Sequence, residues 1–136
     1  MDPYQYVALR CVPRPDREEF VNVGVVLYCP AQRFLGAAWR LDEARLTAFA
    51  PELDLEAVRS ALVAVDLLCS GEAQSGHGVG TRATAYGIRE LADDQSSRFG
   101  LVTAPRSTVL QPGPVHGGMT VDPASNLRRL LDHLVP

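Results

Sequence analysis

Two apolar runs near the N-terminus, separated by a proline-containing segment, constrain the fold more than any other feature of the chain. Residues 4–12 are rich in aromatic and branched side chains, which is typical of a strand. The segment 13–17, Pro-Arg-Pro-Asp-Arg, cannot continue a strand ladder and predicts a loop. Residues 21–29 then predict a second strand, antiparallel to the first. The alternation along it is expected to place Val21, Val23, Val25 and Leu27 on one face and Asn22, Gly24, Val26 and Tyr28 on the other.

The residues after this hairpin predict a third strand and two helices. Residues 34–40 are short, apolar and without helix caps, which favours a strand that completes a meander. Asp42 is expected to cap a short helix that stops at Pro51, and Asp54 to cap a longer one that ends at Gly71. In the longer helix the apolar residues recur at steps of three and four. This stripe consists of Leu55, Val58, Leu62, Val65 and Cys69.

Residues 71–82 are rich in glycine and poor in apolar bulk. Their four glycines predict a flexible loop, and a short helix over 84–92 is an option after it. The pattern Gly-x-Gly-x-Gly-Thr over 76–81 resembles a phosphate-binding loop. It lacks both the Gly-x-Gly-x-x-Gly spacing of a dinucleotide site and the Gly-Lys-Ser/Thr of a nucleotide-binding loop, so we interpret it as a linker.

The last third of the chain predicts one more strand and a final helix. Residues 99–103 have the composition of a fourth strand, which 107–110 extend or return, and a loop over 112–118 follows. Asp122 is expected to cap a C-terminal helix with Pro123 at its first position. The apolar stripe of this helix is Leu127, Leu130, Leu131 and Leu134.

Composition limits the classes of function. A length of 136 residues with 46% hydrophobic content fits a single domain, residues 1–136, that buries its own core. A formal charge of −3 provides no field for phosphate backbones, so we expect no nucleic-acid partner. The N-terminal residues lack the pattern of a secretion signal, and no apolar stretch reaches the roughly 18 residues of a membrane-spanning helix. We therefore expect a cytoplasmic protein without a membrane partner.

Cysteine and histidine spacing does not indicate a metal site. The cysteines are widely spaced, which predicts small buried side chains in a reducing compartment, and the histidines have no acidic partner at ligand spacing. We predict no metal, no cofactor and no catalytic residue. The residues concerned are Cys11, Cys29, Cys69, His77, His116 and His133.

The N-terminal half carries a signature that indicates a family. It reads Tyr4-x-Tyr6, Leu9-Arg10, Val12-Pro13, and then Glu-Phe-Val-Asn-Val-Gly-Val-Val-Leu over 19–27. This resembles the bacterial domain-of-unknown-function family 3037, whose members begin with Tyr-x-Tyr, Arg-x-x-Pro and Glu-Phe-x-Asn-Val-Gly-Val. The likeness continues more loosely to the C-terminal helix. The resemblance implies no established activity. In some bacterial genomes, genes that look like members of this family lie beside genes for HipA-like serine/threonine kinases, which implies an accessory role for the family.

The same signature supplies the candidate site. Antiparallel pairing of the first two strands is expected to bring Arg10, Glu19 and Asn22 together. In a structural interpretation these side chains pair with each other and form hydrogen bonds with the loop backbone. Pro13 then ends a strand, and Gly24 permits a bulge or close packing. In a functional interpretation they form a polar patch that holds a carboxylate, a phosphate or a partner peptide. The aromatic residues expected to flank this patch are Tyr4, Tyr6 and Tyr28.

The expected fold is α+β, an antiparallel β-meander sheet with the central helix and the C-terminal helix packed on one face. The leading functional hypothesis is a non-enzymatic accessory domain that binds a protein partner, such as a HipA-like kinase, through the first hairpin. The alternative is a small-molecule or nucleotide-handling enzyme that uses Arg10, Glu19 and Asn22, and a closed pocket of about 300 Å³ or more beside them would favour it. Self-association through an exposed sheet edge is a third interpretation.

Overall fold

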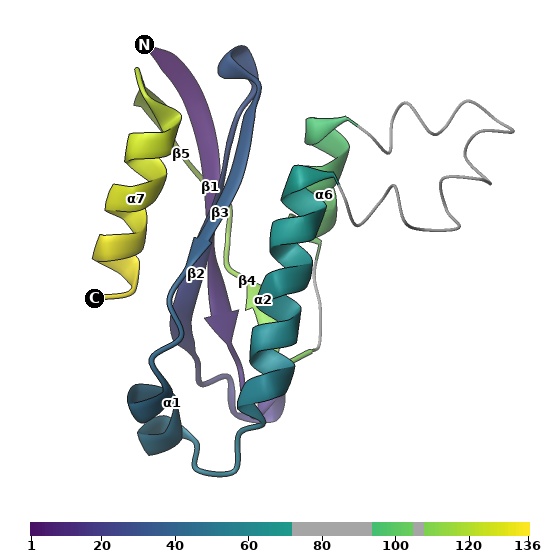
Figure 1. Cartoon of the computed structure of the whole chain (residues 1–136), viewed down its shortest axis with the longest axis vertical. Helices are drawn as coiled ribbons and strands as arrows, with labels where there is room; N and C mark the ends of the chain where they lie inside the picture. Colours follow the sequence, from purple (N-terminus) through teal and green to yellow (C-terminus); the bar gives the residue numbers. More distant parts are fainter. Residues whose placement is uncertain (72–93, 105–107) are drawn as a thin grey trace, which may run out of the picture.

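The computed structural model of the chain describes residues 1–71, 94–104 and 108–136. Within these ranges five antiparallel strands form one open sheet, and helices pack on both of its faces (Figure 1). The predicted α+β class, with an antiparallel meander, a central helix and a C-terminal helix, is confirmed. The placement of the C-terminal helix differs from the prediction.

The first strand lies inside the sheet, whose order is β3-β2-β1-β4. β1 (Asp2–Cys11), β2 (Val21–Cys29) and β3 (Phe34–Trp39) form the predicted meander. On its other side β1 pairs with two short strands. β4 (Leu110–Pro112) lies beside its C-terminal part and β5 (His116–Thr120) beside its N-terminal half.

Two short 3-10 turns connect the strands of the meander. η1 (Pro15–Arg17) lies between β1 and β2, and η2 (Pro30–Gln32) between β2 and β3. Each begins with a proline, whose fixed φ suits the first position of a helical turn. Each ends at a residue in the left-handed region, Glu18 at φ 57° and Arg33 at φ 51°.

A β-bulge in β2 changes which side chains share a face. Leu9 pairs with Gly24 whereas the next residue, Arg10, pairs with Asn22, so Val23 is the extra residue. Val21 and Val23 share a face, as predicted, and so do Val25 and Leu27. The prediction that all four share one face is wrong, because the inserted residue reverses the alternation between the two pairs. One core cluster contains Val21, Val23, Val26 and Tyr28, and the other contains Val25, Leu27 and Cys29.

The helices on the first face begin and end where the sequence predicts. α1 (Glu43–Phe49) and α2 (Leu55–Ser70) start at aspartate caps, and α2 ends at Gly71 with φ 88°. Asp42 accepts a hydrogen bond from the Arg45 amide at 3.1 Å, which satisfies an otherwise unpaired donor of the first turn. The predicted stripe of α2 packs against the sheet, with Val58, Leu62, Val65 and Cys69 buried.

Residues 99–103 form a helix, so the predicted fourth strand is wrong there. They are the second half of α6 (Gln95–Thr103), which begins at Asp94. Phe99 and Val102 are buried three residues apart, on one helical face. A short apolar run does not distinguish a strand from a buried helix, and here packing against α2 and the sheet decides the outcome.

The loop predicted over 112–118 is wrong in its second half, because Gly117 and Gly118 lie in β5. A Cβ atom added to Gly118 would lie 2.6 Å from the Tyr4 ring. Glycine is therefore required at this position by the close approach of an aromatic side chain on the neighbouring strand, and it does not mark a turn.

The C-terminal helix α7 (Pro123–Leu134) packs on the face opposite α2 and α6 (Figure 1). The prediction that it shares their face is wrong. β2 is covered on both sides, since Val25, Val26 and Leu27 are all fully buried. A strand that is buried on both faces reads as a continuous apolar run, which is how residues 21–29 read.

Two predictions concern residues that the structure does not describe. The flexible loop over 71–82 lies outside the described residues after Gly71, and so does the helix over 84–92. Of the described helices, none is long and apolar enough to cross a membrane.

Candidate functional site

Arg10 and Asn22 are cross-strand neighbours at the bulge. Leu9 and Cys11 are buried beneath α2, so the alternation of β1 directs Arg10 toward the face of α7. Asn22 Nδ2 donates a hydrogen bond to the carbonyl of Leu134 at 3.4 Å. Asn22 thus connects the sheet to the end of the C-terminal helix.

The guanidinium group of Arg10 is held between an aromatic ring and the backbone. Its Cζ lies 4.0 Å from the centroid of the Phe20 ring, and a Cβ added to Gly113 would lie 3.1 Å from its Nε. That Nε is buried and has no hydrogen-bond partner in the described part of the chain. The side chain is therefore fixed in orientation by a cation–π contact rather than by a carboxylate. A hollow of about 320 Å³ beside it is lined by Arg10, Val12, Pro15, Glu18, Phe20 and Gln111.

Glu19 pairs within the β1–β2 connection. Its Oε1 lies 2.6 Å from Arg17 Nε, and both side chains are more than half exposed. Glu19 lines a different hollow from Arg10, on the other side of the connection. The backbone thus makes Arg10 and Asn22 cross-strand neighbours, but the side chains of Arg10, Asn22 and Glu19 contact Phe20, Leu134 and Arg17 respectively and do not form one cluster.

The hollow beside Glu19 has a volume of about 520 Å³ and opens between the β1–β2 connection and the α1–α2 connection. Its charged residues carry both signs, with arginines on the first connection and acids on both. Its apolar side chains come from Pro13, Phe49, Ala50, Pro51, Leu53, Ala57 and Val109, and its charged ones from Arg14, Arg17, Glu19, Glu52 and Asp54. The charged residues are all exposed and form a polar rim, whereas the apolar residues, apart from the exposed Pro51 and Ala57, are partly buried and form the floor.

The three tyrosines lie on opposite faces of the sheet. Tyr4 and Tyr6 pack beneath α7 with their ring centroids 6.0 Å apart, and Tyr6 also stacks on His116 at 5.3 Å. Tyr28 packs on the other face, 5.4 Å from the ring of Phe99. All three contribute to the core clusters, so they do not form one patch around the polar residues.

The buried thiols are poorly suited to nucleophilic chemistry. Burial raises the pKa of Cys11 to about 11. Burial, with a smaller contribution from the negative charge of Asp66, raises the pKa of Cys69 to about 12. Both remain protonated at neutral pH, and the thiolate is the reactive form. No group of three or more His, Cys, Asp or Glu side chains that could hold a metal ion occurs among the described residues.

Several residues of the two hollows are not indicated by the sequence pattern. Phe20 belongs to the signature, and an aromatic residue between a charged loop and a strand is a signal that could have identified it. Phe49, Leu53 and Val109 carry no such signal, because only the tertiary fold brings the α1–α2 connection and the start of β4 to the β1–β2 connection. Pro13, predicted as structural, also lines the larger hollow.

No curated protein and no solved structure matches this chain. A family model described as a protein of unknown function (DUF3037) matches residues 6–135. The match runs from β1 to the residue after α7, and therefore includes the hairpin, the bulge and both hollows. The chain thus belongs to the DUF3037 family of proteins of unknown function, as its N-terminal signature indicated.

Proposed function

We propose that this chain is a cytoplasmic, non-enzymatic accessory domain that binds a segment of a partner protein at the β1–β2 connection. The observation that carries the proposal is the hollow of about 520 Å³, with its apolar floor and its rim of both charges. Such a depression accepts an apolar side chain of a peptide, while the rim pairs with polar groups beside it.

The second hollow extends this surface. Residues 13, 14, 17 and 19 line the larger hollow, and residues 15, 18 and 20 line the smaller one. The connection is therefore a ridge between two depressions. A peptide that crosses the ridge reaches Arg10, whose guanidinium group can donate two hydrogen bonds to a carboxylate. We expect the bound segment to contain an apolar residue and an acidic residue.

The chemistry of the larger hollow supports binding over reaction. Arg17 and Glu19 neutralise each other, and the carboxylate of Asp54 accepts the Ala57 amide at the start of α2. The described lining contains no Ser, Thr, Cys, His, Lys or Tyr side chain that could serve as a nucleophile or as a base near neutral pH. A reaction here would depend on the carboxylates of Glu19, Glu52 and Asp54, of which Glu19 and Asp54 already have these partners, so we infer that the rim orients a ligand.

The first partner to test is a HipA-like kinase, which the family resemblance implies. The two proteins are co-expressed and co-purified, and the affinity is measured by calorimetry. Reversing charges in Arg14→Glu/Arg17→Glu should weaken binding by at least about tenfold, because both guanidinium groups lie on the rim. The matched control is Arg128→Glu/Arg129→Glu, which reverses two exposed arginines on α7 and should leave the affinity unchanged.

Two outcomes count against the proposal in different ways. If the kinase does not bind, the identity of the partner is wrong. If it binds and the two double variants are affected equally, the partner does not use the β1–β2 connection.

A second candidate function is a small-molecule or nucleotide-handling enzyme. The volume of the larger hollow favours it, since small-molecule sites start at about 300 Å³. The separation of Glu19 from Arg10 and Asn22 weighs against the trio as one site. Thermal unfolding in the presence of a panel of nucleotides tests this candidate. A rise in Tm that Arg14→Glu/Arg17→Glu abolishes would support it over the protein partner.

A further inference from the structure

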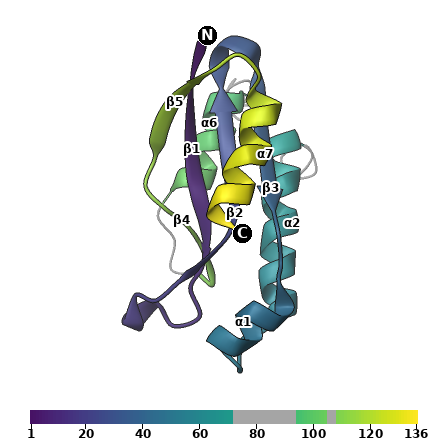
Figure 2. The same cartoon turned by 90° about the vertical axis from the view of Figure 1, so that its left-hand side faces the viewer.

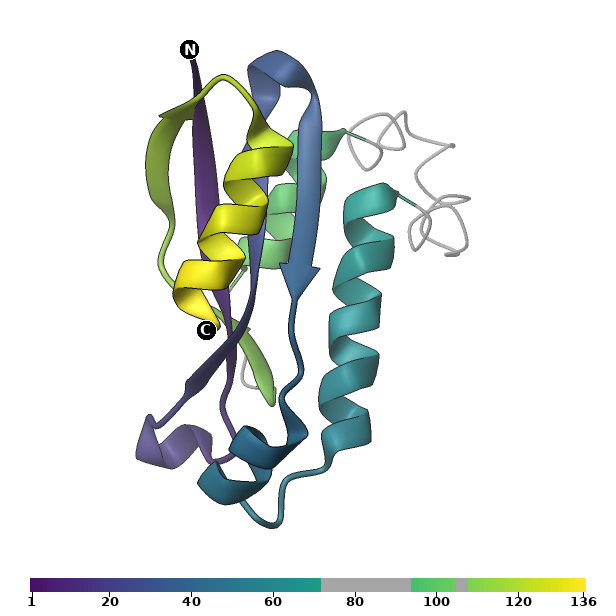
Figure 3. The same cartoon turned by 60° about the vertical axis from the view of Figure 1, so that its left-hand side comes forward.

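The outer edge of β5 is unprotected. β5 pairs with β1 on one side, and no strand that the structure describes pairs with its other side. Figures 2 and 3 show it at the margin of the sheet. Backbone N–H and C=O groups of alternate residues therefore point outward. Natural edge strands are commonly guarded by Lys, by Pro or by other charges, and residues 115–121 contain none of Lys, Arg, Asp, Glu or Pro.

One face of this edge is also apolar and uncovered. Thr120 bonds Asn126 of α7 at 2.6 Å and His116 stacks on Tyr6, so both point toward α7. The alternation of the strand places the residues between and beside them on the opposite face. These are Val115, Gly117, Met119 and Val121, of which Val115, Met119 and Val121 are 48%, 54% and 71% exposed.

We propose that β5 pairs with β5 of a second copy of this chain, antiparallel about a two-fold axis at Gly118. The two sheets then join edge to edge. Such a contact uses the same surface twice, so the surface must not repel itself, and an uncharged strand meets this condition. The site lies beside the N-terminal half of β1, whereas both hollows lie at the C-terminal end of β1. Dimer formation is thus independent of the proposed partner site.

The register follows from the side chains that it brings opposite each other. Gly117 of one copy lies opposite Met119 of the second copy, so the long thioether side chain covers the position that lacks a side chain. Val115 lies opposite Val121 of the second copy, and β-branched residues form favourable cross-strand pairs. Gly118 lies opposite itself. This self-complementarity selects a second copy over a strand of another protein.

The size of the contact predicts a weak dimer. β5 has five residues, and the ladder buries little beyond them and the flanking valines. Stable interfaces bury about 1,200–2,000 Å² in total, which a ladder of this length does not reach. We expect a monomer–dimer equilibrium over a protein concentration range of about 10 μM to 1 mM.

Sedimentation velocity of the full chain over that range tests the proposal. Met119→Lys should weaken dimerisation by about tenfold or more, because two like charges are brought close across the axis. Val63→Lys is the control, since Val63 is 42% exposed on α2, away from the edge, and should leave dimerisation unchanged. Both positions are exposed in the monomer, so both variants should fold, which circular dichroism verifies.

A cross-linking experiment tests the register. A Val115→Cys chain is mixed with a Val121→Cys chain and treated with a short bis-maleimide. Opposed residues lie about 5 Å apart between Cβ atoms, whereas identical residues lie about 20 Å apart across the axis. We expect the mixed cross-link between the two chains and little cross-link within either type. The native cysteines, Cys11, Cys29 and Cys69, are buried and should not react.

Three results overturn the proposal. The first is a monomer at every concentration, and the second is a dimer that Met119→Lys and Val63→Lys affect equally. The third is a dimer in which identical positions cross-link as readily as Val115→Cys with Val121→Cys.

Discussion

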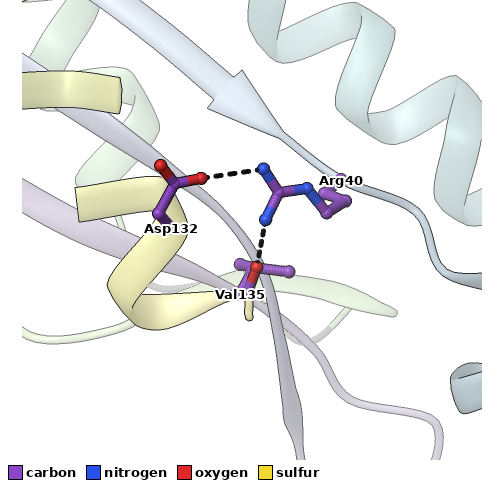
Figure 4. Close-up of polar contacts among 3 residues, drawn as sticks. All are labelled: Arg40, Asp132 and Val135. Atoms are coloured by element: carbon purple, nitrogen blue, oxygen red, sulfur yellow. Dashed lines mark hydrogen bonds and ion pairs between the residues drawn. The ribbon is translucent and has the colours of Figure 1, made fainter. Parts of the chain in front are cut away.

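Trp39 and Arg40, adjacent at the end of β3, bind helices on opposite faces of the sheet. Trp39 Nε1 donates a hydrogen bond to Asp66 of α2 at 2.8 Å. Arg40 Nη2 lies 2.9 Å from Asp132 of α7, and Nη1 donates to the carbonyl of Val135 (Figure 4). Successive residues of an extended chain point to opposite sides, so two residues connect both helical layers to the sheet.

Replacing Trp39 by Phe should lower the free energy of unfolding by about 1–2 kcal/mol, because the partly buried Asp66 carboxylate loses its donor. Urea denaturation measures the loss. Asp66→Asn keeps an oxygen acceptor for the indole and should cost less. If Trp39→Phe still costs as much in an Asp66→Ala background, where the indole has no acceptor at position 66, the hydrogen bond is not the source of the effect.

Replacing Arg40 by Met should cost about 1 kcal/mol, mainly through the hydrogen bond to the Val135 carbonyl. The ion pair itself contributes less, since the side chains of Arg40 and Asp132 are 44% and 63% exposed and water screens the attraction. Asp132→Asn should therefore cost less than Arg40→Met in the same denaturation experiment. Equal losses for the two variants would assign the stabilisation to the ion pair instead.

Gly24 and Gly100 should respond in opposite directions to substitution by Ala. A Cβ at Gly24 would lie 2.8 Å from the Ala38 carbonyl oxygen, which is backbone and cannot move cheaply, so Gly24→Ala should cost about 1–3 kcal/mol. A Cβ at Gly100 meets nothing within 4 Å and lies in the middle of α6, so Gly100→Ala should stabilise by about 0.5–1 kcal/mol. Thermal unfolding of both variants measures the difference, and a loss of stability in Gly100→Ala would contradict the helical assignment of residues 99–103.

The elements that the sequence predicts correctly are those determined by nearby residues. The meander follows from apolar runs bounded by prolines. The helix starts follow from Asp42, Asp54 and Asp122, each of which accepts an amide three residues ahead. In these cases the signal and the interaction lie within the same few residues, so no tertiary information is required.

The features that the sequence does not predict depend on contacts between distant segments. Gly24 permits a bulge, but the sequence does not show that the bulge forms, that Val23 is the extra residue, or that the faces are therefore reversed. Gly118 is typical of a turn, but it lies in β5. Glycine is needed there because the Tyr4 ring occupies the space that a side chain would fill. For the candidate site, cross-strand pairing correctly brings Arg10 beside Asn22, but the partner of Glu19 is Arg17 within the loop.

Two buried thiols predict that stability falls at alkaline pH. Burial raises the pKa of Cys11 to about 11 and that of Cys69 to about 12, from the ordinary thiol value of 9.0 that applies when the chain is unfolded. Between the unfolded and the folded pKa the folded state keeps protons that the unfolded state has lost. The two thiols should therefore leave the free energy of unfolding unchanged below about pH 8 and lower it as the pH rises through 9 and above. Urea denaturation at a series of pH values measures this slope.

The matched control is Cys11→Ala/Cys69→Ala, compared with the original chain at each pH. The double variant loses packing and should be less stable throughout, but its stability should decrease less between pH 9 and 11 because the two shifted groups are gone. The chain contains no lysine, and its tyrosines and Cys29 are common to both proteins, so their contribution cancels in the comparison. Thiolate absorbance at 240 nm provides an independent readout. The difference in this absorbance between the original chain and the double variant isolates Cys11 and Cys69 from Cys29 and the tyrosines, which also absorb near this wavelength. The difference should rise well above pH 9, and an early rise near pH 8 would show that water reaches Cys11 or Cys69 despite their burial.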